Sequence, residues 1–457
     1  MITVAQKNAK IAKKLMAKFF FKTDRDSNVI YIYNDKRGVY TTGAESYIRE
    51  SVQWELKEDT TKHAVSEIVD YIARSTITRE GEEFDSNPDL LVVGNGVLNV
   101  ITKQLAPHNP SYLAMRSVAV DYDPLAECPL TRLTLAQLLT EDDYDQIVKF
   151  LGYLLIPDNR YKRALALVGP RNTGKTTLLS LFLNLLGVSN VAMEKIQRLC
   201  DANFSEFELV GKMANVRDDI DAATIDNAEK IKELTGDFVA TKVEQKYVQR
   251  RTTFRNRAKL IFTTNLMPLP KRPDPVYFGR WVIVEMRRQF HFGASTDADS
   301  RAIVDLKGKL SEELSGVLNL ALVGREMLVK DNGFREYDDE MATYRYLAYA
   351  GNNAGRFLTN RVCVDPDGAI TKGVLYGLYQ GFCRLQGEPY QDANELAKML
   401  KAVFPMVING WVGNSKAWRG ISVREDDKAG YVPRFQYGGV SIKPSDMVDC
   451  DNDERNY

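Results

Sequence analysis

A glycine-rich segment in the middle of the chain has the residue types that bind phosphate. It consists of Gly169, Pro170, Arg171, Asn172, Thr173, Gly174, Lys175, Thr176 and Thr177. Glycines let backbone N–H groups approach phosphate oxygens, the lysine meets the charge of the β and γ phosphates, and a hydroxyl ligates Mg²⁺. An apolar run precedes the segment and an apolar stretch follows it. We therefore predict a P-loop between a buried strand and a helix, binding ATP and Mg²⁺, with Thr176 as a metal ligand.

Two adjacent carboxylates, Asp218 and Asp219, follow a short apolar run. One carboxylate can hold Mg²⁺ while the other polarises the attacking water. We assign Asp218 to the metal and Asp219 to the water, and the reverse assignment stays open. A solvated acidic turn is the alternative, because Asn215 and Arg217 interrupt the run that precedes the pair.

Two further polar residues lie at the ends of apolar runs. Asn265 follows residues 259–264, and its amide could donate to the γ-phosphate and position the water. Arg280 precedes residues 281–284, and an arginine there could stabilise the transition state across a subunit interface. For an isolated arginine, a surface ion pair is the alternative. The predicted catalytic set is Lys175, Asp218, Asp219, Asn265 and Arg280.

Cations and an aromatic ring alternate shortly before residue 259. Lys246, Tyr247, Arg250 and Arg251 combine charges for the nucleic-acid backbone with a ring on which a base can stack. We predict that these residues bind DNA; a solvated charged turn is the alternative.

Strands and helices must bring these side chains together. Between residues 165 and 290, short apolar runs alternate with helical patterns, which predicts an α/β fold with a parallel sheet. The predicted segments are 1–115, an N-terminal accessory α+β region; 116–155, a collar-like helical bundle; 156–300, the motor; 301–355, a helical extension; 356–425, a compact domain; and 426–457, a polar and partly disordered tail.

Composition limits the class of protein. At 457 residues, the length suggests about three domains. No run approaches the roughly 20 apolar residues that cross a bilayer, so we expect no membrane partner. We expect the protein in the cytoplasm or at the site where a virus or plasmid replicates. Lys and Arg total 61 and Asp and Glu total 61, so a surface that binds nucleic acid must be local. The five cysteines include no C-x-x-C pair, which argues against a zinc site or disulfide framework.

The order of the motifs resembles that of superfamily 3 helicases, in the poxvirus-like and phage or plasmid primase-helicase branch. The similarity covers about residues 85–425. Outside the motifs above, it rests on residues 94–98, 108–110, 120–124, 234–237, 244–247 and 264–270. Where the family often has paired arginines, this chain has Gly279-Arg280, which leaves Arg280 as the one arginine-finger candidate at that position.

The resemblance implies an AAA+-like motor that assembles as a homohexameric ring. It implies a hairpin in the central channel that touches single-stranded DNA, and unwinding in the three-prime to five-prime direction. It also implies that residues 356–425 form a winged-helix-like domain, in which Lys398, Lys401, Lys416 and Arg419 could meet duplex phosphates.

From these features we expect an ATP hydrolase that acts as a replicative DNA helicase of a virus, phage or plasmid. Its expected partners are single-stranded and forked DNA, other copies of itself, and a primase or polymerase. One alternative is an ATPase that loads or remodels origin DNA without processive unwinding. Another is the helicase part of a primase-polymerase.

Overall fold

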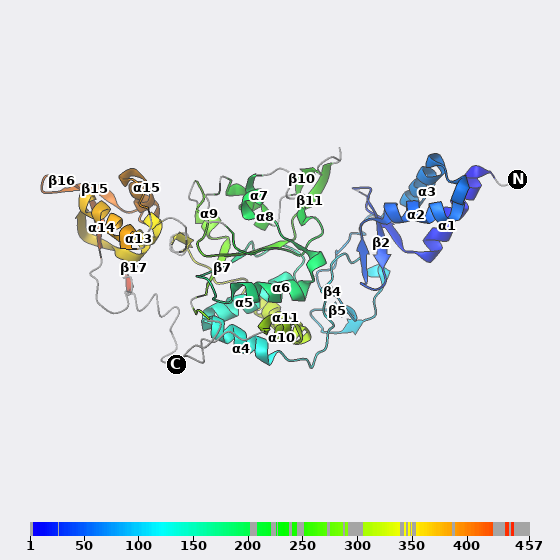
Figure 1. Ribbon diagram of the computed structural model, residues 1–457, viewed down its shortest axis with the longest axis horizontal. Helices are drawn as coiled ribbons and strands as arrows, with labels where there is room; N and C mark the ends of the chain where they lie inside the picture. Colours follow the sequence, from blue (N-terminus) through cyan, green and yellow to red (C-terminus); the bar gives the residue numbers. More distant parts are fainter. Residues whose placement is uncertain are drawn as a thin grey trace.

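The computed structural model describes most of the chain, and the fold below refers to those residues. They are 3–25, 27–201, 208–220, 225, 227–236, 240–244, 251–271, 275–286, 288–290, 305–338, 342–343, 346–347, 349, 353–385, 389–423, 435–437 and 440–442. Figure 1 shows an elongated molecule with the N-terminal helices at one end, a parallel sheet in the centre and a smaller α/β body at the other end.

The N-terminal body consists of three helices packed on a small antiparallel sheet. Helix α1 begins with a capping box, in which Thr3 and Gln6 exchange side-chain to backbone hydrogen bonds. Ala12, Ile48 and Ile68, one from each helix, are fully buried in the core of this body. The elements are α1 (Val4–Lys18), β1 (Phe21–Thr23), β2 (Ile30–Asn34), β3 (Val39–Thr41), α2 (Ala44–Leu56) and α3 (Lys62–Ser75).

A second antiparallel sheet connects this body to the centre of the molecule. Its strands are β4 (Leu90–Val93), β5 (Gly96–Asn99) and β6 (Leu105–Ala106). Leu91 and Leu98 belong to the same apolar cluster as the central sheet. The Asn95 side chain bonds the backbone N–H and the carbonyl of Tyr122 and so fixes the chain that leads into the central body.

Five parallel strands form the central sheet. Their order in the sheet is β13-β7-β12-β9-β8. The first of them along the chain, β7, therefore lies inside the sheet, between β13 and β12. All five residues of β7 are buried, as is usual for a parallel sheet covered on both faces. The strands are β7 (Ala164–Val168), β8 (Val191–Ala192), β9 (Ala214–Arg217), β12 (Lys259–Thr264) and β13 (Trp281–Glu285).

Helices cover both faces of this sheet, and alternate residues of each strand serve the two faces. Leu165 and Leu167 pack in a cluster with α5 (Glu141–Leu154), α6 (Lys175–Leu186) and α11 (Leu314–Lys330). Ala164 and Ala166 pack in another cluster with α7 (Ile196–Asp201) and α8 (Glu229–Thr235). The same side of the molecule carries the hairpin of β10 (Ala240–Glu244) and β11 (Arg251–Arg255) (Figure 1). The remaining helices of the central body are α4 (Pro129–Leu138), α9 (Pro275–Phe278) and α10 (Leu306–Ser311).

Helices α5 and α11 approach each other closely through glycines. A Cβ atom at Gly324 would lie 1.8 Å from the carbonyl oxygen of Val148, and one at Gly152 would lie 2.0 Å from the backbone nitrogen of Arg325. Because no larger residue fits at either position, this crossing fixes α11 against the layer that covers the sheet.

A fully buried lysine lies at the amino end of β12. Lys259 is 2% exposed, and its ammonium group donates to the carbonyls of Ile156, Asp158 and Arg257. The same nitrogen lies 4.7 Å from the centre of the Tyr153 ring. The charge is therefore solvated by carbonyls and a ring in place of water, and it fixes the chain between α5 and β7 to the sheet.

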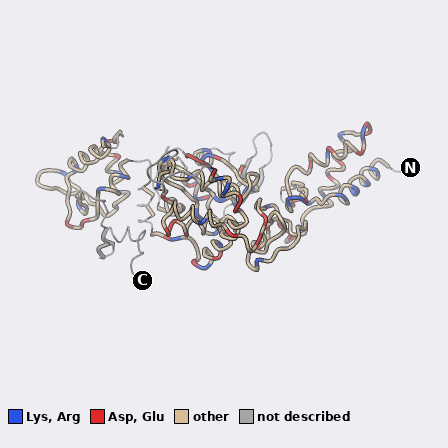
Figure 2. The backbone as a smooth tube through the Cα atoms, turned by 60° about the horizontal axis from the view of Figure 1, so that its bottom comes forward, with Lys and Arg blue, Asp and Glu red and all other residues tan. Residues whose placement is uncertain are grey.

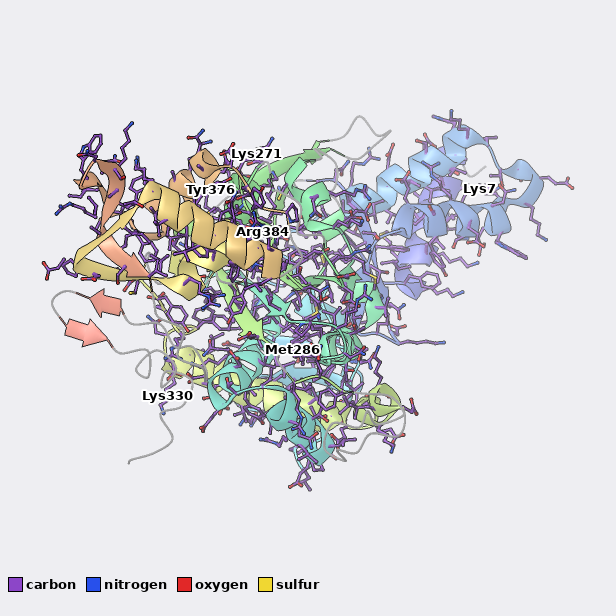
Figure 3. All side chains as sticks on the ribbon, turned by 60° about the vertical axis from the view of Figure 1, so that its left-hand side comes forward. Lys7, Lys271, Met286, Lys330, Tyr376 and Arg384 are labelled. Atoms are coloured by element: carbon purple, nitrogen blue, oxygen red, sulfur yellow. The ribbon has the colours of Figure 1, made fainter. Side chains whose placement is uncertain are left out.

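The C-terminal body combines three helices with an antiparallel sheet of order β14-β16-β15. Its second helix, α14, runs along one side, with Tyr376 and Arg384 labelled in Figure 3. The elements are α13 (Asn353–Arg361), β14 (Val362–Thr371), α14 (Lys372–Leu385), α15 (Ala393–Val403), β15 (Ile408–Val412) and β16 (Ser415–Val423). A separate hairpin joins β17 (Phe435–Tyr437) to β18 (Val440–Ile442).

The α/β class predicted from the sequence is confirmed, with a parallel five-stranded sheet consistent with a nucleotide-binding fold. Within the described residues, no helix combines the length and the apolar character needed to cross a membrane. Acidic and basic residues are both scattered over the three bodies in Figure 2, and their totals are equal.

Candidate functional site

The glycine-rich segment forms the turn between strand β7 and helix α6 at the carboxyl edge of the central sheet. Gly174 precedes the helix in a left-handed conformation with φ of 87°, which favours glycine. A Cβ atom at Gly169 would lie 2.2 Å from the carbonyl oxygen of Met286, a residue in the interior of the molecule (Figure 3). The two glycines therefore allow the loop to turn sharply against the neighbouring strand.

Hydrogen bonds from three parts of the chain hold the loop. The backbone nitrogen of Gly169 donates to Thr264 at 3.2 Å, and that of Phe290 donates to Asn172 at 2.8 Å. Within the loop, the Thr173 hydroxyl donates to the carbonyl of Pro170 at 3.0 Å. Pro170, Arg171, Asn172 and Thr176 are exposed, whereas Thr173 is buried. The loop is thus held by its backbone hydrogen bonds, while most of its side chains are exposed to solvent. Thr177 follows on the first turn of α6.

Lys175 lies where the loop meets the adjacent strand. Its ammonium group donates to the carbonyls of Gly169 and Pro170, and to the Asn265 side-chain oxygen at 3.2 Å. Burial lowers the pKa of Lys175 below its ordinary value, and the charges of Asp218 and Asp219 offset part of that decrease. The cation therefore faces both carboxylates and the strand tip that carries Asn265.

Asp218 and Asp219 directly follow strand β9. The Thr176 hydroxyl donates to one Asp218 oxygen at 3.1 Å, and the Thr263 hydroxyl donates to the other. Thr263 in turn accepts the backbone N–H of Asp219 at 2.8 Å. Asp219 has a left-handed backbone with φ of 50°, which turns the chain directly after its neighbour.

The strand that precedes this pair is short but well supported. Its buried Asn215 accepts the backbone N–H of Glu194 at 2.8 Å and donates to the carbonyl of the same residue at 3.0 Å. The amide that interrupts the apolar pattern therefore bonds the chain beside the sheet edge, and it does not disrupt the strand.

Arg280 lies at the opposite edge of the sheet. It precedes β13, and its carbonyl accepts the backbone N–H of Ala164, the first residue of β7. Burial lowers the pKa of Arg280, and the nearby positive charge of Arg163 lowers it further. Both arginines line a cavity of about 250 Å³ together with Arg335 and the carboxylates Asp142, Asp143 and Glu336.

The structure thus brings four of the five predicted catalytic residues to one edge: Lys175, Asp218, Asp219 and Asn265. It places Arg280 about five strand residues away, or roughly 16 Å at 3.3 Å per residue. Within one chain, Arg280 therefore does not reach the loop of that chain.

The predicted DNA-binding residues can be followed only in part. Lys246, Tyr247 and Arg250 lie outside the described residues, between strands β10 and β11. Arg251 begins β11, where its backbone pairs with Glu244. DNA binding by these four residues remains a prediction.

Sequence reasoning missed two residues beside the predicted ones. Thr263 bonds both Asp218 and Asp219, and its only local signal is a hydroxyl two residues before Asn265. Arg163 neighbours Arg280 because β7 and β13 pair in register. No short motif in the sequence indicates that Arg163 lies beside Arg280.

Comparison with known proteins gives two family matches. Residues 6–140 match a family described as D5 N terminal like. Residues 167–278, which include the loop, both carboxylates and Asn265, match a family of unknown function, DUF5906. No curated protein matches the chain.

Among solved structures, the chain is similar to the C-terminal region of NrS-1. For an A-form apo structure of that region, the identity is 13%, the TM-score is 0.45, and the match covers 91% of this chain and 99% of the other. A second apo structure gives 13% identity, a TM-score of 0.44 and coverage of 91% and 99%. A likeness of this size does not establish a shared activity. The family likeness of this chain thus rests on residues 6–140, which are similar to the D5 N-terminal-like family.

Proposed function

We propose that this chain is an ATP-hydrolysing replicative DNA helicase of a virus, phage or plasmid, acting as a ring in the cytoplasm or at the site of replication. The observation that carries the proposal is the convergence of Lys175, Thr176, Asp218 and Asn265 at the carboxyl edge of a parallel sheet. In open α/β sheets, ligands bind at this edge. The match to the D5 N-terminal-like family supports a place among viral and phage primase-helicases.

In this proposal, residues 169–177 form a P-loop that binds the phosphates of ATP. The backbone N–H groups at the start of α6 point toward the loop, where the helix dipole favours an anion. Lys175 is held by two loop carbonyls, Gly169 and Pro170. Phosphate oxygens are stronger partners for an ammonium group than neutral carbonyls, so Lys175 would turn from the carbonyls to the β and γ phosphates.

The carboxylate and hydroxyl oxygens fit Mg²⁺, which accepts few protein ligands and keeps several waters. Thr176 and Asp218 already lie 3.1 Å apart, so they would hold the metal together. When bound, Mg²⁺ would neutralise charge on the phosphates. Asp219, next to this pair and close enough to Lys175 to affect its pKa, would orient the water, and Asn265 would meet the γ-phosphate.

The ring is needed to complete this site. Arg280 lies at the edge opposite the loop, so it would reach the ATP of a neighbouring copy. The same proposal includes membership of superfamily 3, assembly as an AAA+-like hexamer and a primase or polymerase partner. It also includes a winged-helix fold for residues 356–425. The hairpin of β10 and β11 would carry Lys246, Tyr247, Arg250 and Arg251 to single-stranded DNA.

The test is ATP turnover and strand displacement on forked DNA by wild type and by Lys175→Ala. Lys212→Ala is the matched control, because Lys212 precedes β9 and its side chain donates to the carbonyl of Ser189 at 2.7 Å, away from the loop. We expect Lys175→Ala to lose ATP hydrolysis at an unchanged melting temperature, and the control to retain it. Wild-type turnover in Lys175→Ala would refute the site.

Two alternatives have distinct outcomes in the same assays. DNA-stimulated ATP turnover without strand displacement on any fork would indicate an ATPase that loads or remodels origin DNA. Primer synthesis on a bare template would indicate the helicase part of a primase-polymerase.

A further inference from the structure

The hairpin of β15 and β16 carries an unusual combination of charge and exposed aromatic surface. From residue 396 to residue 423 the sequence has no Asp or Glu, and its four cations are Lys398, Lys401, Lys416 and Arg419. In a chain with no net charge, such a segment forms a local positive surface. Figure 1 shows β15 and β16 at the end of the molecule opposite the N-terminal helices.

Strand register places a tryptophan and a lysine side by side on one face of this hairpin. Trp411 pairs with Lys416, and Asn409 pairs with Trp418. Because directly paired residues and residues two apart share a face of a sheet, all four lie on the same face. Trp411 is 58% exposed, whereas Trp418 is 4% exposed.

Two further lysines reach this face from helices. Lys372, which begins α14, donates to the Asn409 side chain at 2.7 Å, and its nitrogen lies 3.9 Å from the centre of the Trp418 ring. The Lys401 nitrogen lies 5.9 Å from the same ring. Trp418 is thus covered by two lysines, while Trp411 presents its surface to solvent. We call Lys372, Lys401, Asn409, Trp411 and Lys416 the Trp411 face.

Carboxylates of the described C-terminal body lie elsewhere. Asp365 and Asp367 are on β14, which is separated from β15 by β16. Glu395 pairs with Lys398 at 2.6 Å, and Asp392 caps the start of α15. The three lysines of the Trp411 face are therefore not neutralised by the acidic residues of that body.

We propose that the Trp411 face binds unpaired nucleic-acid strands, with one base stacked on Trp411 and the phosphates met by Lys372, Lys401 and Lys416. A base exposes its flat face only where it is unpaired, and aromatic stacking beside cations is how proteins bind single strands. A duplex presents phosphates to the lysines but offers the indole only base edges. The site extends the proposed function to a second DNA contact, and it requires no ATP turnover.

The direct test uses the full chain without nucleotide and a dye-labelled oligothymidylate, with binding measured by fluorescence anisotropy. A stacked base is worth about 1–3 kcal/mol, so Trp411→Ala is expected to weaken binding about 5- to 150-fold. Trp411→Phe, which keeps a ring, is expected to retain most of the affinity. Trp54→Ala is the matched control, because Trp54 is 73% exposed but lies on helix α2.

Intrinsic fluorescence reports Trp411 separately from any other DNA contact. Of the four tryptophans, Trp281 and Trp418 are buried, so in Trp54→Phe the exposed emission comes from Trp411. We expect the oligonucleotide to quench this emission, and a blunt duplex to quench it much less. A plot of log K against log salt concentration has a slope of about −0.7 for each single-strand phosphate that is neutralised. Lys416→Gln is therefore expected to reduce the magnitude of this slope by about 0.7.

Several results would overturn the proposal. One is that the oligonucleotide does not quench the Trp411 emission, and another is that the blunt duplex quenches it equally. A third is that Trp411→Ala binds the oligonucleotide within twofold of the wild-type affinity at the same melting temperature. A change of oligomeric state in Trp411→Ala with normal oligonucleotide binding would show that the face contacts another copy of the chain. Lys175→Ala is expected to keep the quenching, so loss of ATP turnover and failure of this site can be told apart.

Discussion

The two edges of the central sheet both carry charged side chains, but these charges are satisfied differently. At the carboxyl edge, Lys175, Thr176 and Asp218 bond one another or the adjacent strand tip. At the amino edge, Arg280 makes no side-chain hydrogen bond or ion pair with a residue that the structure describes, and the positive charge of Arg163 lowers its pKa. Arg163 itself pairs with Glu336 at 3.4 Å. One edge therefore has its polar side chains bonded to one another, whereas at the other edge the charge of Arg280 has no direct partner among the described residues, although carboxylates line the same cavity.

This difference indicates how the two edges could cooperate. Burial and a second arginine both disfavour the charge of Arg280, so an anionic partner would be favourable there. The carboxyl edge of another copy, once it binds a nucleotide, would supply such an anion. The following experiments test this relation between the edges, beginning with the largest expected effect.

Arg280→Ala should reduce ATP turnover about 10³- to 10⁵-fold while nucleotide binding survives, as for arginines supplied in trans in GTPase systems. Steady-state hydrolysis and equilibrium binding measure the two effects. Arg160→Ala is the control, because Arg160 pairs with the nearby Asp158 at 2.5 Å and should leave turnover intact. Mixed Arg280→Ala and Lys175→Ala subunits should recover some activity. A rate per chain that is unchanged down to clear monomer would contradict the role in trans.

Asn265→Ala should reduce turnover about 10²- to 10³-fold, the usual cost of removing one donor that meets developing charge. The measurement is single-turnover hydrolysis at saturating ATP. Asn265→Gln keeps the amide but moves it by one methylene, and partial recovery there would show that position matters. If Asn265→Ala hydrolyses ATP at the wild-type rate, Asn265 is not a catalytic residue.

Thr263→Val should weaken the apparent Mg²⁺ affinity about 10- to 100-fold, the usual cost of losing a group that orients a metal ligand. The valine keeps the shape of the side chain but can neither donate to Asp218 nor accept from the backbone of Asp219. Titration of turnover with Mg²⁺ gives the affinity, and Thr263→Ser should restore most of it. A change in maximal rate alone, with normal Mg²⁺ dependence, would indicate another role.

Lys175 in the nucleotide-free protein should titrate at lower pH than an ordinary lysine, because burial disfavours its charge. The sign follows from protonation: the buried group releases its proton first as pH rises, so this charge is lost below the pH at which exposed lysines lose theirs. Carbon-13 NMR of the lysine Cε signals can measure this, with Lys175→Arg assigning the resonance. ATP should raise the pKa again. A Lys175 that titrates with the bulk of the lysines would mean that its charge is fully solvated.

Much of the carboxyl edge could be predicted because its signals are local. An apolar run, a loop with two glycines and an apolar helix define the β7–α6 unit without reference to distant residues. Asn265 was found in the same way, as a polar residue after an apolar run. Asn215 was misleading, because the hydrogen bonds to Glu194 that support its strand are not visible in the local pattern.

The remaining features depend on long-range pairing. Thr263 contacts Asp218 and Asp219 only because β12 lies beside β9, and Arg163 neighbours Arg280 only because β13 lies beside β7. The close crossing of α5 and α11 depends on Gly152 and Gly324 meeting in space. In the sequence, both are isolated glycines inside helical patterns, which give no indication of a partner.

The buried Lys259 has a consequence for chemical labelling. Acylating reagents attack the neutral, accessible amine of a lysine, but this nitrogen is enclosed by the carbonyls of Ile156, Asp158 and Arg257 and by the Tyr153 ring. It can react only when the amino edge of the sheet opens, and such openings occur at rates set by local stability. In a mass-spectrometric time course, modification of Lys259 would therefore measure how often the centre of the molecule opens, without any engineered probe.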